Sequence, residues 1–206
     1  MRRGTAPDDS HERRLGGCVA GIDEAGRGPW AGPVVAAAVI LRPGAAPAGI
    51  TDSKQLAAPE RERLARLIAD AGWIGIGQAS VEEIDRLNIL AATMLAMRRA
   101  VAALALPPEA ALVDGNRAPA LDCRTETLVK GDALSLSIAA ASIVAKTHRD
   151  GEMRRLAALH PGYGWERNAG YGTPEHRAAL VRLGPTPQHR RSFRPVKALL
   201  DSDVSP

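Results

Sequence analysis

The sequence predicts an α/β protein: a mixed five-stranded sheet with helices on both faces, followed by a helical extension at the C-terminus. Apolar segments of strand length are expected at 18–24, 34–41, 73–79, 110–113 and 126–129, and segments of helical periodicity alternate with the later ones. Strands interleaved with helices are typical of layers packed around one core. At 206 residues the chain is long enough for one domain with a full core and a small appendage.

Local signals predict where the first elements begin and end. The segment 26–33, rich in glycine, separates the first two strands, so we expect a hairpin. Pro59 favours a helix from that point to about residue 71, because proline is tolerated in the first helical turn. Ser80 and Glu83 have the spacing of a capping box, which predicts a single helix to about residue 104.

The second half of the chain is expected to be mainly helical. A long helix is predicted from residue 133 to about residue 160, where Pro161 ends it. A glycine-rich loop follows over 163–173, then a helix to about residue 183 and a last short helix around 194–200. Residues 1–15 are polar and are expected to form a flexible arm.

Composition limits the class of protein and its location. The chain is 45% hydrophobic and 24% charged, as in soluble globular proteins, and no apolar run approaches the roughly 20 residues of a membrane helix. The N-terminus lacks the apolar segment of a secretory signal. Two cysteines, Cys18 and Cys123, suit a reducing compartment, and we expect a cytoplasmic location.

Positive charge is concentrated in the last part of the chain. The whole chain carries a net charge of +4, and the segment from His148 onwards holds 10 Lys and Arg against 6 Asp and Glu. A basic surface beside an acidic site is typical of a protein that binds a polyanion such as nucleic acid. A basic, solvated helix face without that function remains the alternative interpretation.

Three predicted strands end in acids: Asp23 and Glu24, then Asp114, then Asp132. Ligands of open α/β sheets gather at strand ends, so these four carboxylates are expected to converge. Carboxylates within a few ångströms of each other stay ionised only beside cations, and an all-oxygen ligand set favours Mg²⁺ or Mn²⁺. Two such ions about 4 Å apart would clamp a scissile phosphate.

Alternative, structural roles remain for these acids and for other polar residues. Asp114 precedes a glycine, as an ordinary turn residue would, and Asp132 is placed to cap the long helix. Asp150 is expected to form a structural ion pair with Lys146, one helical turn earlier. His176 is expected to be a cap or surface residue rather than a metal ligand.

The turn after the first acids has the chemistry of a phosphate contact. Gly26 and Gly28 flank Arg27, so the backbone can approach a ligand closely while the guanidinium binds phosphate. A hairpin with a charged turn is the alternative interpretation. The spacing of the glycines excludes a loop that binds a dinucleotide, because the next glycine after Gly28 is Gly32. A loop that binds a nucleoside triphosphate is also excluded, because no Gly-Lys-Ser/Thr follows.

Several motifs, in order along about residues 17–197, resemble those of the bacterial ribonuclease HII family, the type 2 ribonucleases H. The first is Asp-Glu-Ala-Gly-Arg-Gly-Pro-x-Ala-Gly-Pro-Val-Val-Ala-Ala-Ala-Val at 23–39. The others are Asp-Ser-Lys-Gln-Leu at 52–56, Asp-Gly at 114–115, Lys-Gly-Asp at 130–132, the run at 138–146 and Gly-Tyr-Gly-Thr at 170–173. Each alone is weak, and together they are specific.

The resemblance implies a ribonuclease H-like fold and a metal-dependent endoribonuclease. It implies cleavage of the RNA strand of RNA–DNA hybrids and incision 5′ of single ribonucleotides in duplex DNA, leaving 5′-phosphate and 3′-hydroxyl ends. We predict a division into a flexible arm at 1–15, a ribonuclease H-like catalytic domain at 16–160 and a helical substrate-binding extension at 161–206. The expected partners are hybrid and ribonucleotide-containing duplexes, with no membrane, and a monomer is expected.

The resemblance also assigns roles to residues. The four catalytic and metal-binding acids of the family match Asp23, Glu24, Asp114 and Asp132, and its backbone-contacting element matches Gly26, Arg27 and Gly28. Its tyrosine that senses the RNA–DNA junction matches Tyr171. Lys54 and Lys146 are candidate phosphate anchors, or else a loop cation and a helix ion pair. The departures, at Trp30, Ala169 and Thr147-His148, leave the acids untouched.

Two other functions compete with this one. Another two-metal nuclease of the ribonuclease H-like fold, acting on DNA, would keep the acids but would not need Gly26, Arg27, Gly28 or Tyr171. A non-catalytic hybrid-binding protein would tolerate the loss of any acid, whereas all four are present.

Overall fold

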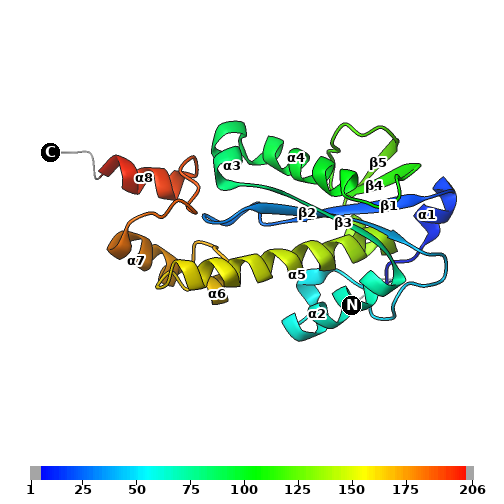
Figure 1. Cartoon of the computed structure of the whole chain (residues 1–206), viewed down its shortest axis with the longest axis horizontal. Helices are drawn as coiled ribbons and strands as arrows, with labels where there is room; N and C mark the ends of the chain where they lie inside the picture. Colours follow the sequence, from blue (N-terminus) through cyan, green and yellow to red (C-terminus); the bar gives the residue numbers. More distant parts are fainter. Residues whose placement is uncertain (1–5, 203–206) are drawn as a thin grey trace.

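The computed structural model describes residues 6–202, and a mixed five-stranded sheet forms its centre (Figure 1). The strand order is β3-β2-β1-β4-β5. Neighbours β1, β2 and β3 pair antiparallel, whereas β4 pairs parallel to β1 and β5 parallel to β4. The predicted mixed sheet is therefore confirmed. The strands are β1 Val19–Ala25, β2 Val34–Leu41, β3 Gly72–Ala79, β4 Ala110–Asp114 and β5 Arg124–Leu128.

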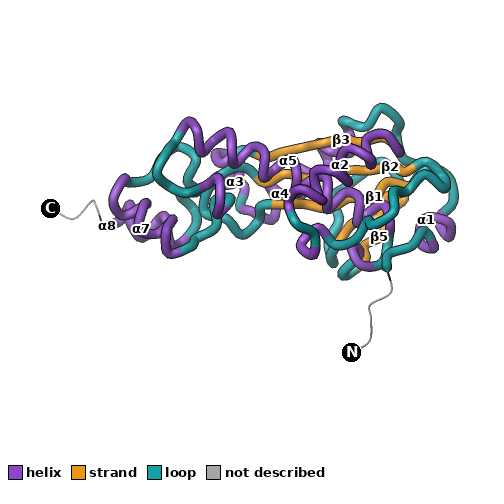
Figure 2. Tube along the Cα trace, turned by 90° about the horizontal axis from the view of Figure 1, so that it is seen from below, coloured by secondary structure: helices purple, strands orange, loops and turns teal. Residues whose placement is uncertain are grey.

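Helices cover both faces of the sheet and extend beyond one end (Figures 1 and 2). Helices α3 and α4 lie on one face, α2 and α5 lie on the other, and α7 and α8 lie at the end opposite α1. None of the helices in residues 6–202 is long and apolar enough to span a bilayer. The α-helices are α1 Ser10–Leu15, α2 Ala58–Ala71, α3 Val81–Leu87, α4 Ile89–Ala102, α5 Leu136–Leu159, α6 Trp165–Asn168, α7 Pro174–Leu183 and α8 Arg194–Ser202, with short 3₁₀ turns at Ser53–Gln55 and Gly131–Ala133.

Strand β2 is apolar along its whole length because both of its faces are buried. Ala36 and Ala38 pack in one cluster with α3 and α4, while Ala37 and Val39 pack in another with α2 and α5. A third cluster joins the C-terminal half of α5 to α6, α7 and α8. The helical extension therefore packs on the end of α5.

Small residues bring α5 close to β1, the strand that carries the first acids. A Cβ atom on Gly21 would lie 2.1 Å from the backbone carbon of Ser137, so only glycine fits there. Facing it, α5 opens with small, buried residues at 139–141. This close approach places α5 beside the edge of the sheet where β1 ends.

Two helix boundaries differ from the predictions. The single helix expected from Ser80 to about residue 104 is divided into α3 and α4 at Asn88, which has a φ of 73°. The Asn88 side chain accepts hydrogen bonds from the amides of Leu90 and Ala91, so it caps a second helix. The long helix begins at Leu136 with Ser135 as its N-cap, and Asp132 lies in the 3₁₀ turn before it.

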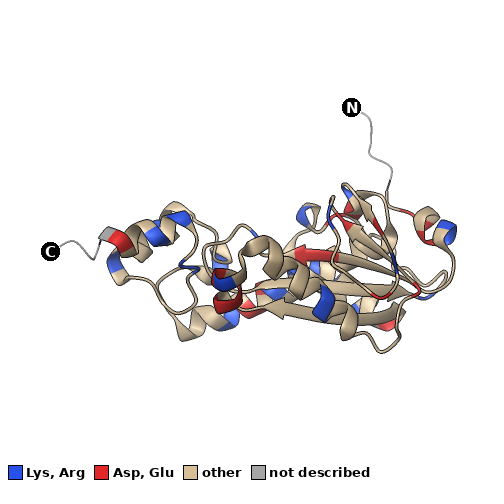
Figure 3. Ribbon diagram, turned by 90° about the horizontal axis from the view of Figure 1, so that it is seen from above, with Lys and Arg blue, Asp and Glu red and all other residues tan. Residues whose placement is uncertain are grey.

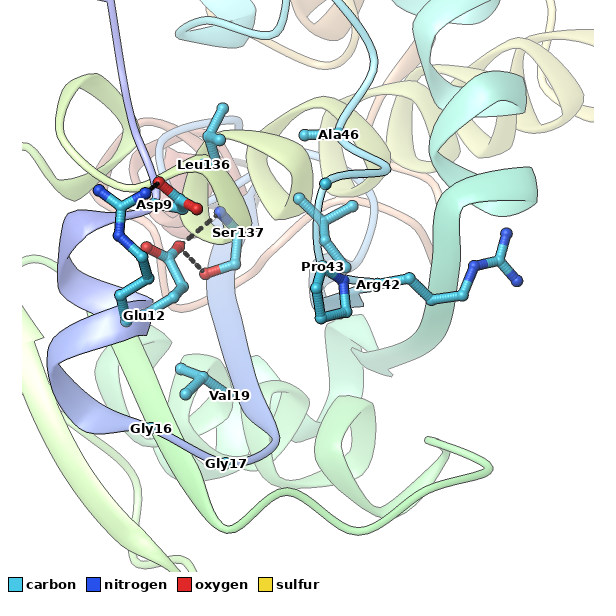
Figure 4. Close-up of a pocket in the computed structure, with 13 residues that line it drawn as sticks. Asp9, Glu12, Gly16, Gly17, Val19, Arg42, Pro43, Ala46, Leu136 and Ser137 are labelled. Carbon is cyan, nitrogen blue, oxygen red and sulfur yellow. Dashed lines mark hydrogen bonds and ion pairs between the residues drawn. The ribbon is translucent and has the colours of Figure 1, made fainter.

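The expectation of a flexible arm does not describe residues 8–15, where α1 is anchored to α5 (Figure 4). One carboxylate oxygen of Glu12 accepts hydrogen bonds from the amide and hydroxyl of Ser137, at 2.9 and 2.6 Å, and from the hydroxyl of Ser135. Figure 4 shows the hollow beside this contact, of about 400 Å³, between α1 and the loop at 42–46. Residues 1–5, the rest of the expected arm, lie outside the described residues.

Protonation of Glu83 should weaken the capping box that begins α3. Arg99 donates two hydrogen bonds to this carboxylate and the Ser80 amide donates a third, which lowers the pKa of Glu83 to about 2. Because the pKa is depressed on folding, the stabilisation is present above the ordinary pKa of 4.5 and is lost as the pH falls towards 2.

Glu83→Gln should therefore lower the free energy of unfolding by about 1 kcal/mol at pH 7, and the difference from wild type should shrink below pH 4.5. Thermal melts across this pH range measure the effect. Glu62→Gln, which removes an ion pair with Arg154 outside any cap, is the control. A constant difference at all pH values would contradict the assignment.

Candidate active site

The ends of β1 and β4 bring three of the predicted acids to one place. These strands are parallel neighbours, with Ile22 opposite Val113, so Asp23, Glu24 and Asp114 follow at the same edge of the sheet. All three line a hollow of about 260 Å³. Asp23 is 5% exposed, and its Oδ1 atom accepts a hydrogen bond from the Glu24 amide at 2.7 Å.

Asp132 lies at the margin of this hollow. Asp132 is buried in the 3₁₀ turn before α5. The residue before it, Gly131, donates a 2.7 Å hydrogen bond from its amide to Oδ1 of Asp114. The Oδ2 atom of Asp132 lies 3.8 Å from the ammonium of Lys54, which does line the hollow. The structure therefore brings three of the predicted acids together in one hollow and places Asp132 at its margin.

Repulsion between these acids makes the site electrostatically unfavourable on its own. Burial raises the pKa of Asp23 well above its ordinary value, and the charges of Glu24 and Asp114 raise it further. Burial also raises the pKa of Glu24, although Arg27 donates a 3.2 Å hydrogen bond to its carboxylate. The pKa of Asp132 is raised by burial and by Asp114. Such a site favours a bound cation.

The donor set suits a hard divalent cation. Carboxylate oxygens are the ligands that Mg²⁺ and Mn²⁺ prefer. Within residues 6–202, no group of three or more His, Cys, Asp or Glu side chains is arranged to hold a metal ion. Mg²⁺ does not require such a group, because it keeps several waters and takes one or two carboxylates together with substrate phosphate. The residues therefore fit this class of ion without forming a complete protein cage.

The turn after β1 forms another wall of the same hollow. Gly26, Arg27 and Gly28 line it, and the side chain of Arg27 is 50% exposed. Among residues 6–202, no protein group accepts a hydrogen bond from the backbone amides of Arg27 and Gly28. These amides are therefore available to a ligand.

Tyr171 lies opposite this turn and is 47% exposed. A Cβ atom on Gly28 would lie 3.5 Å from its ring, which shows how closely the two segments approach. The structure thus brings together residues from 23–28 and 171, which are far apart in the sequence.

The two candidate phosphate anchors have different surroundings. Lys146 lines the hollow, and its ammonium pairs with Asp150 at 2.6 Å, which confirms the predicted ion pair. Arg61 also contacts Asp150, at 3.0 Å. The side chain of Lys54 is 78% exposed, and its ammonium lies 3.8 Å from Oδ2 of Asp132.

Two serines of the site were not predicted individually from the sequence. The hydroxyls of Ser53 and Ser142 lie 2.8 Å apart, both residues line the hollow, and Ser142 partly offsets the rise in the pKa of Asp23. They connect the turn that carries Lys54 to α5. Both lie within motifs used for the family resemblance, which was the available signal.

Buried polar residues behind the site were also missed. His176, expected to be a cap or surface residue, is fully buried, and its Nδ1 lies 2.9 Å from the carbonyl oxygen of Tyr171. Its Nε2 lies 3.1 Å from Nε2 of His189 and accepts a hydrogen bond from Trp165. Two arginines, Arg149 and Arg190, are buried beneath the turn after β1. No local pattern in the sequence marks these residues.

Comparisons with known proteins agree with this geometry. The family model described as Ribonuclease HII matches residues 20–196. Ribonuclease HII of Rhodospirillum rubrum is 62% identical, with 97% of this chain and 94% of that protein covered. Ribonuclease HII of Paramagnetospirillum magneticum is 60% identical, with 92% of this chain and 96% of that protein covered.

Among solved structures, ribonuclease H2 from Pyrococcus horikoshii OT3 superposes with a TM-score of 0.76 at 26% identity, covering 89% of this chain and 97% of that one. The mixed sheet with flanking helices is thus the ribonuclease H-like fold predicted from the motifs. Because the family model spans most of the chain and the relatives align along nearly all of it, the chain belongs to the ribonuclease HII family, enzymes that are endonucleases of the ribonuclease H type.

Proposed function

We propose that this enzyme hydrolyses the RNA strand of RNA–DNA hybrids and incises duplex DNA on the 5′ side of single embedded ribonucleotides, leaving 5′-phosphate and 3′-hydroxyl ends. One observation carries the proposal: three of the four acids, the free amides of Arg27 and Gly28, and Tyr171 line the same hollow, and Asp132 lies at its margin. Groups for phosphodiester chemistry and groups that can contact a sugar therefore lie within reach of one nucleotide.

In this proposal Asp23, Glu24, Asp114 and Asp132 hold Mg²⁺ or Mn²⁺. When bound, such ions lower the pKa of a water molecule and stabilise negative charge on the scissile phosphate and the leaving oxygen. The Glu24 amide holds Asp23 through a 2.7 Å hydrogen bond, and the amide of Gly131 holds Asp114. These contacts orient the carboxylates before substrate arrives.

Recognition of the ribonucleotide depends on its 2′-hydroxyl, which both donates and accepts hydrogen bonds. The amides of Arg27 and Gly28 are donors on one side of the hollow. The hydroxyl of Tyr171 is a second polar contact, and its ring can stack on the next sugar and test for the absence of a 2′-oxygen. Together these groups distinguish an RNA–DNA junction from uniform DNA.

The rest of the duplex is held through its phosphates. Lys54 and Lys146 lie at the hollow, and Lys and Arg recur along the end of the molecule built by α7 and α8 (Figure 3). Contacts of this kind are indifferent to base sequence and weaken steeply with salt. We therefore assign substrate binding to the extension at 161–206, and we propose a monomer that acts in the cytoplasm.

The decisive experiment uses a labelled DNA duplex with one embedded ribonucleotide, incubated with Mg²⁺, with Mn²⁺ or with a chelator. We expect metal-dependent incision on the 5′ side of the ribonucleotide and none in the matched all-DNA duplex. Cleavage of the all-DNA duplex would favour a DNA nuclease of the same fold. Tight binding without cleavage under either metal would favour a hybrid-binding protein.

Substitutions of Tyr171 separate its ring from its hydroxyl. Tyr171→Ala should lower kcat/KM on the single-ribonucleotide duplex by about 10- to 100-fold, because stacking on an aromatic ring contributes about 1–3 kcal/mol. Tyr171→Phe keeps the ring and should lose about fivefold, as for one hydrogen bond. Both variants are assayed in parallel on a long hybrid, where the smaller loss is expected. Equal losses on the two substrates would contradict the junction role.

A further inference from the structure

Arg190, between α7 and α8, is fully buried, and its guanidinium is bonded to the turn that follows β1. It donates hydrogen bonds to the carbonyl oxygens of Gly26 at 2.6 Å, Arg27 at 3.0 Å, Gly32 at 2.8 Å and Pro33 at 3.2 Å. Its own amide donates to the carbonyl of Trp30. One side chain from the C-terminal extension thus holds most of the turn.

In residues 6–202 this guanidinium is hydrogen-bonded to carbonyl oxygens and lies over the ring of Phe193, 5.1 Å from its centroid. No carboxylate in the described part of the chain forms an ion pair with Arg190. Burial lowers its pKa to about 9, and the nearby Arg149 contributes, so the group is still charged at neutral pH. A buried charge without a counter-ion is unfavourable unless its donors are satisfied. Its hydrogen bonds therefore fix the positions of the carbonyl groups strongly.

The planar peptide bond converts these bonds into an orientation for the amides. In a trans peptide the carbonyl oxygen and the amide hydrogen point in opposite directions, and the described chain has no cis peptide. When the Gly26 carbonyl points inward to Arg190, the Arg27 amide points away from it. The Arg27 carbonyl and the Gly28 amide are related in the same way. These are the two amides that no protein group in residues 6–202 binds.

We propose that Arg190 is a positioning residue for ribonucleotide recognition: by holding the carbonyls of Gly26 and Arg27 inward, it presents the next two amides to the 2′-hydroxyl of the substrate. This rests on the proposed function of the hollow. Arg149 has a different role. It donates hydrogen bonds to the carbonyl oxygens of Ala31, Pro33 and Ala169 and so connects the turn to the loop that carries Tyr171. Within residues 6–202, Arg190 alone hydrogen-bonds to the carbonyls that orient the amides of Arg27 and Gly28.

The test compares two duplexes that differ by one 2′-hydroxyl, a single-ribonucleotide duplex and its all-DNA counterpart, bound in chelator so that no cleavage occurs. Arg190→Gln should reduce the preference for the ribonucleotide duplex by about tenfold, as for one to two hydrogen bonds. Its affinity for the all-DNA duplex should stay near that of the wild type, because the phosphate contacts are unchanged. Arg190→Lys keeps the charge with fewer donors. Its preference for the ribonucleotide duplex should lie between those of the wild type and Arg190→Gln.

Met97→Ala is the control, because Met97 lies in α4 and is buried against the sheet face away from α5, and its truncation destabilises the fold without removing a hydrogen bond of the turn. A wild-type preference retained in Arg190→Gln, or lost equally in Met97→Ala, overturns the proposal. If Arg190→Gln does not fold, the lysine variant decides. If neither folds, Arg190 belongs to the folding core and the positioning role is overturned. A wild-type protein that binds both duplexes equally would instead count against the proposed function.

Discussion

Asp114→Asn should abolish cleavage while leaving binding to an RNA–DNA hybrid largely intact. Asp114 ends β4 in the hollow, and the Gly131 amide already occupies one of its oxygens. An amide in place of the carboxylate keeps the shape and removes one of the charges that would hold a divalent cation. We expect kcat to fall by at least about a thousandfold, as for loss of a principal electrostatic group of an active site.

Stability measurements distinguish a functional acid from a structural one. The charge of Asp114 helps to raise the pKa of Asp23, so the two carboxylates repel each other in the metal-free protein. Asp114→Asn should therefore raise the free energy of unfolding of the metal-free enzyme by about 1 kcal/mol. Mg²⁺ should stabilise the wild type more than the variant, because a ligand that binds only the native state raises its stability.

The control is Asp122→Asn, an exposed acid in the loop before β5. This variant should cleave and melt like the wild type. If Asp114→Asn loses hybrid binding in parallel with activity, or lowers the melting temperature of the metal-free protein, the acid supports the fold and the assignment to catalysis is wrong.

Features that depend on neighbouring residues were predictable from the sequence. The capping box of Ser80 and Glu83 begins α3 as expected, and the continuous apolar run at 34–41 is a strand buried on both faces. Three of the acids, Asp23, Glu24 and Asp114, also came together, because parallel neighbours end at the same edge of a sheet. In the first two cases a short stretch of sequence determines the outcome, and in the third the parallel pairing of β1 with β4 does.

Two predictions of helix boundaries were wrong because two local signals in the sequence competed. Asn88 lies within a stretch of helical periodicity, yet its side chain caps the following helix and its backbone takes a left-handed conformation. Asp132 and Ser135 are both suitable N-caps, and the structure uses Ser135. Asparagine and serine compete with the helix through their own hydrogen bonds, which periodicity alone does not reveal.

The supports beneath the site were not predictable, because their partners are remote in sequence. Arg190 and the Gly26 carbonyl are 164 positions apart, and Arg149 and the Ala31 carbonyl are 118 apart. A basic residue near the C-terminus is more often solvated or bound to phosphate, and the net charge of this segment favoured that interpretation. Only the fold shows that two of its arginines bind backbone carbonyls instead.

Gly26→Ala should lower both stability and activity much more than Gly28→Ala, although the two glycines are two residues apart. Gly26 is buried with a φ of 94°, and a Cβ atom there would lie 1.9 Å from Nε of Arg149. Gly28 is exposed, and a Cβ atom would make only ordinary contact with Tyr171, at 3.5 Å. The backbone conformation and the clash therefore restrict position 26 alone.

We expect Gly26→Ala to lower the free energy of unfolding by about 3 kcal/mol, from left-handed strain and overpacking together. Because the turn must shift to relieve the clash, kcat/KM on the single-ribonucleotide duplex should fall by about a hundredfold. Gly28→Ala should change stability by less than about 1 kcal/mol. Denaturant melts and incision kinetics on both variants measure these differences. Equal stability of the two variants would mean that Arg149 moves aside at little cost, and that the turn is not held rigidly from beneath.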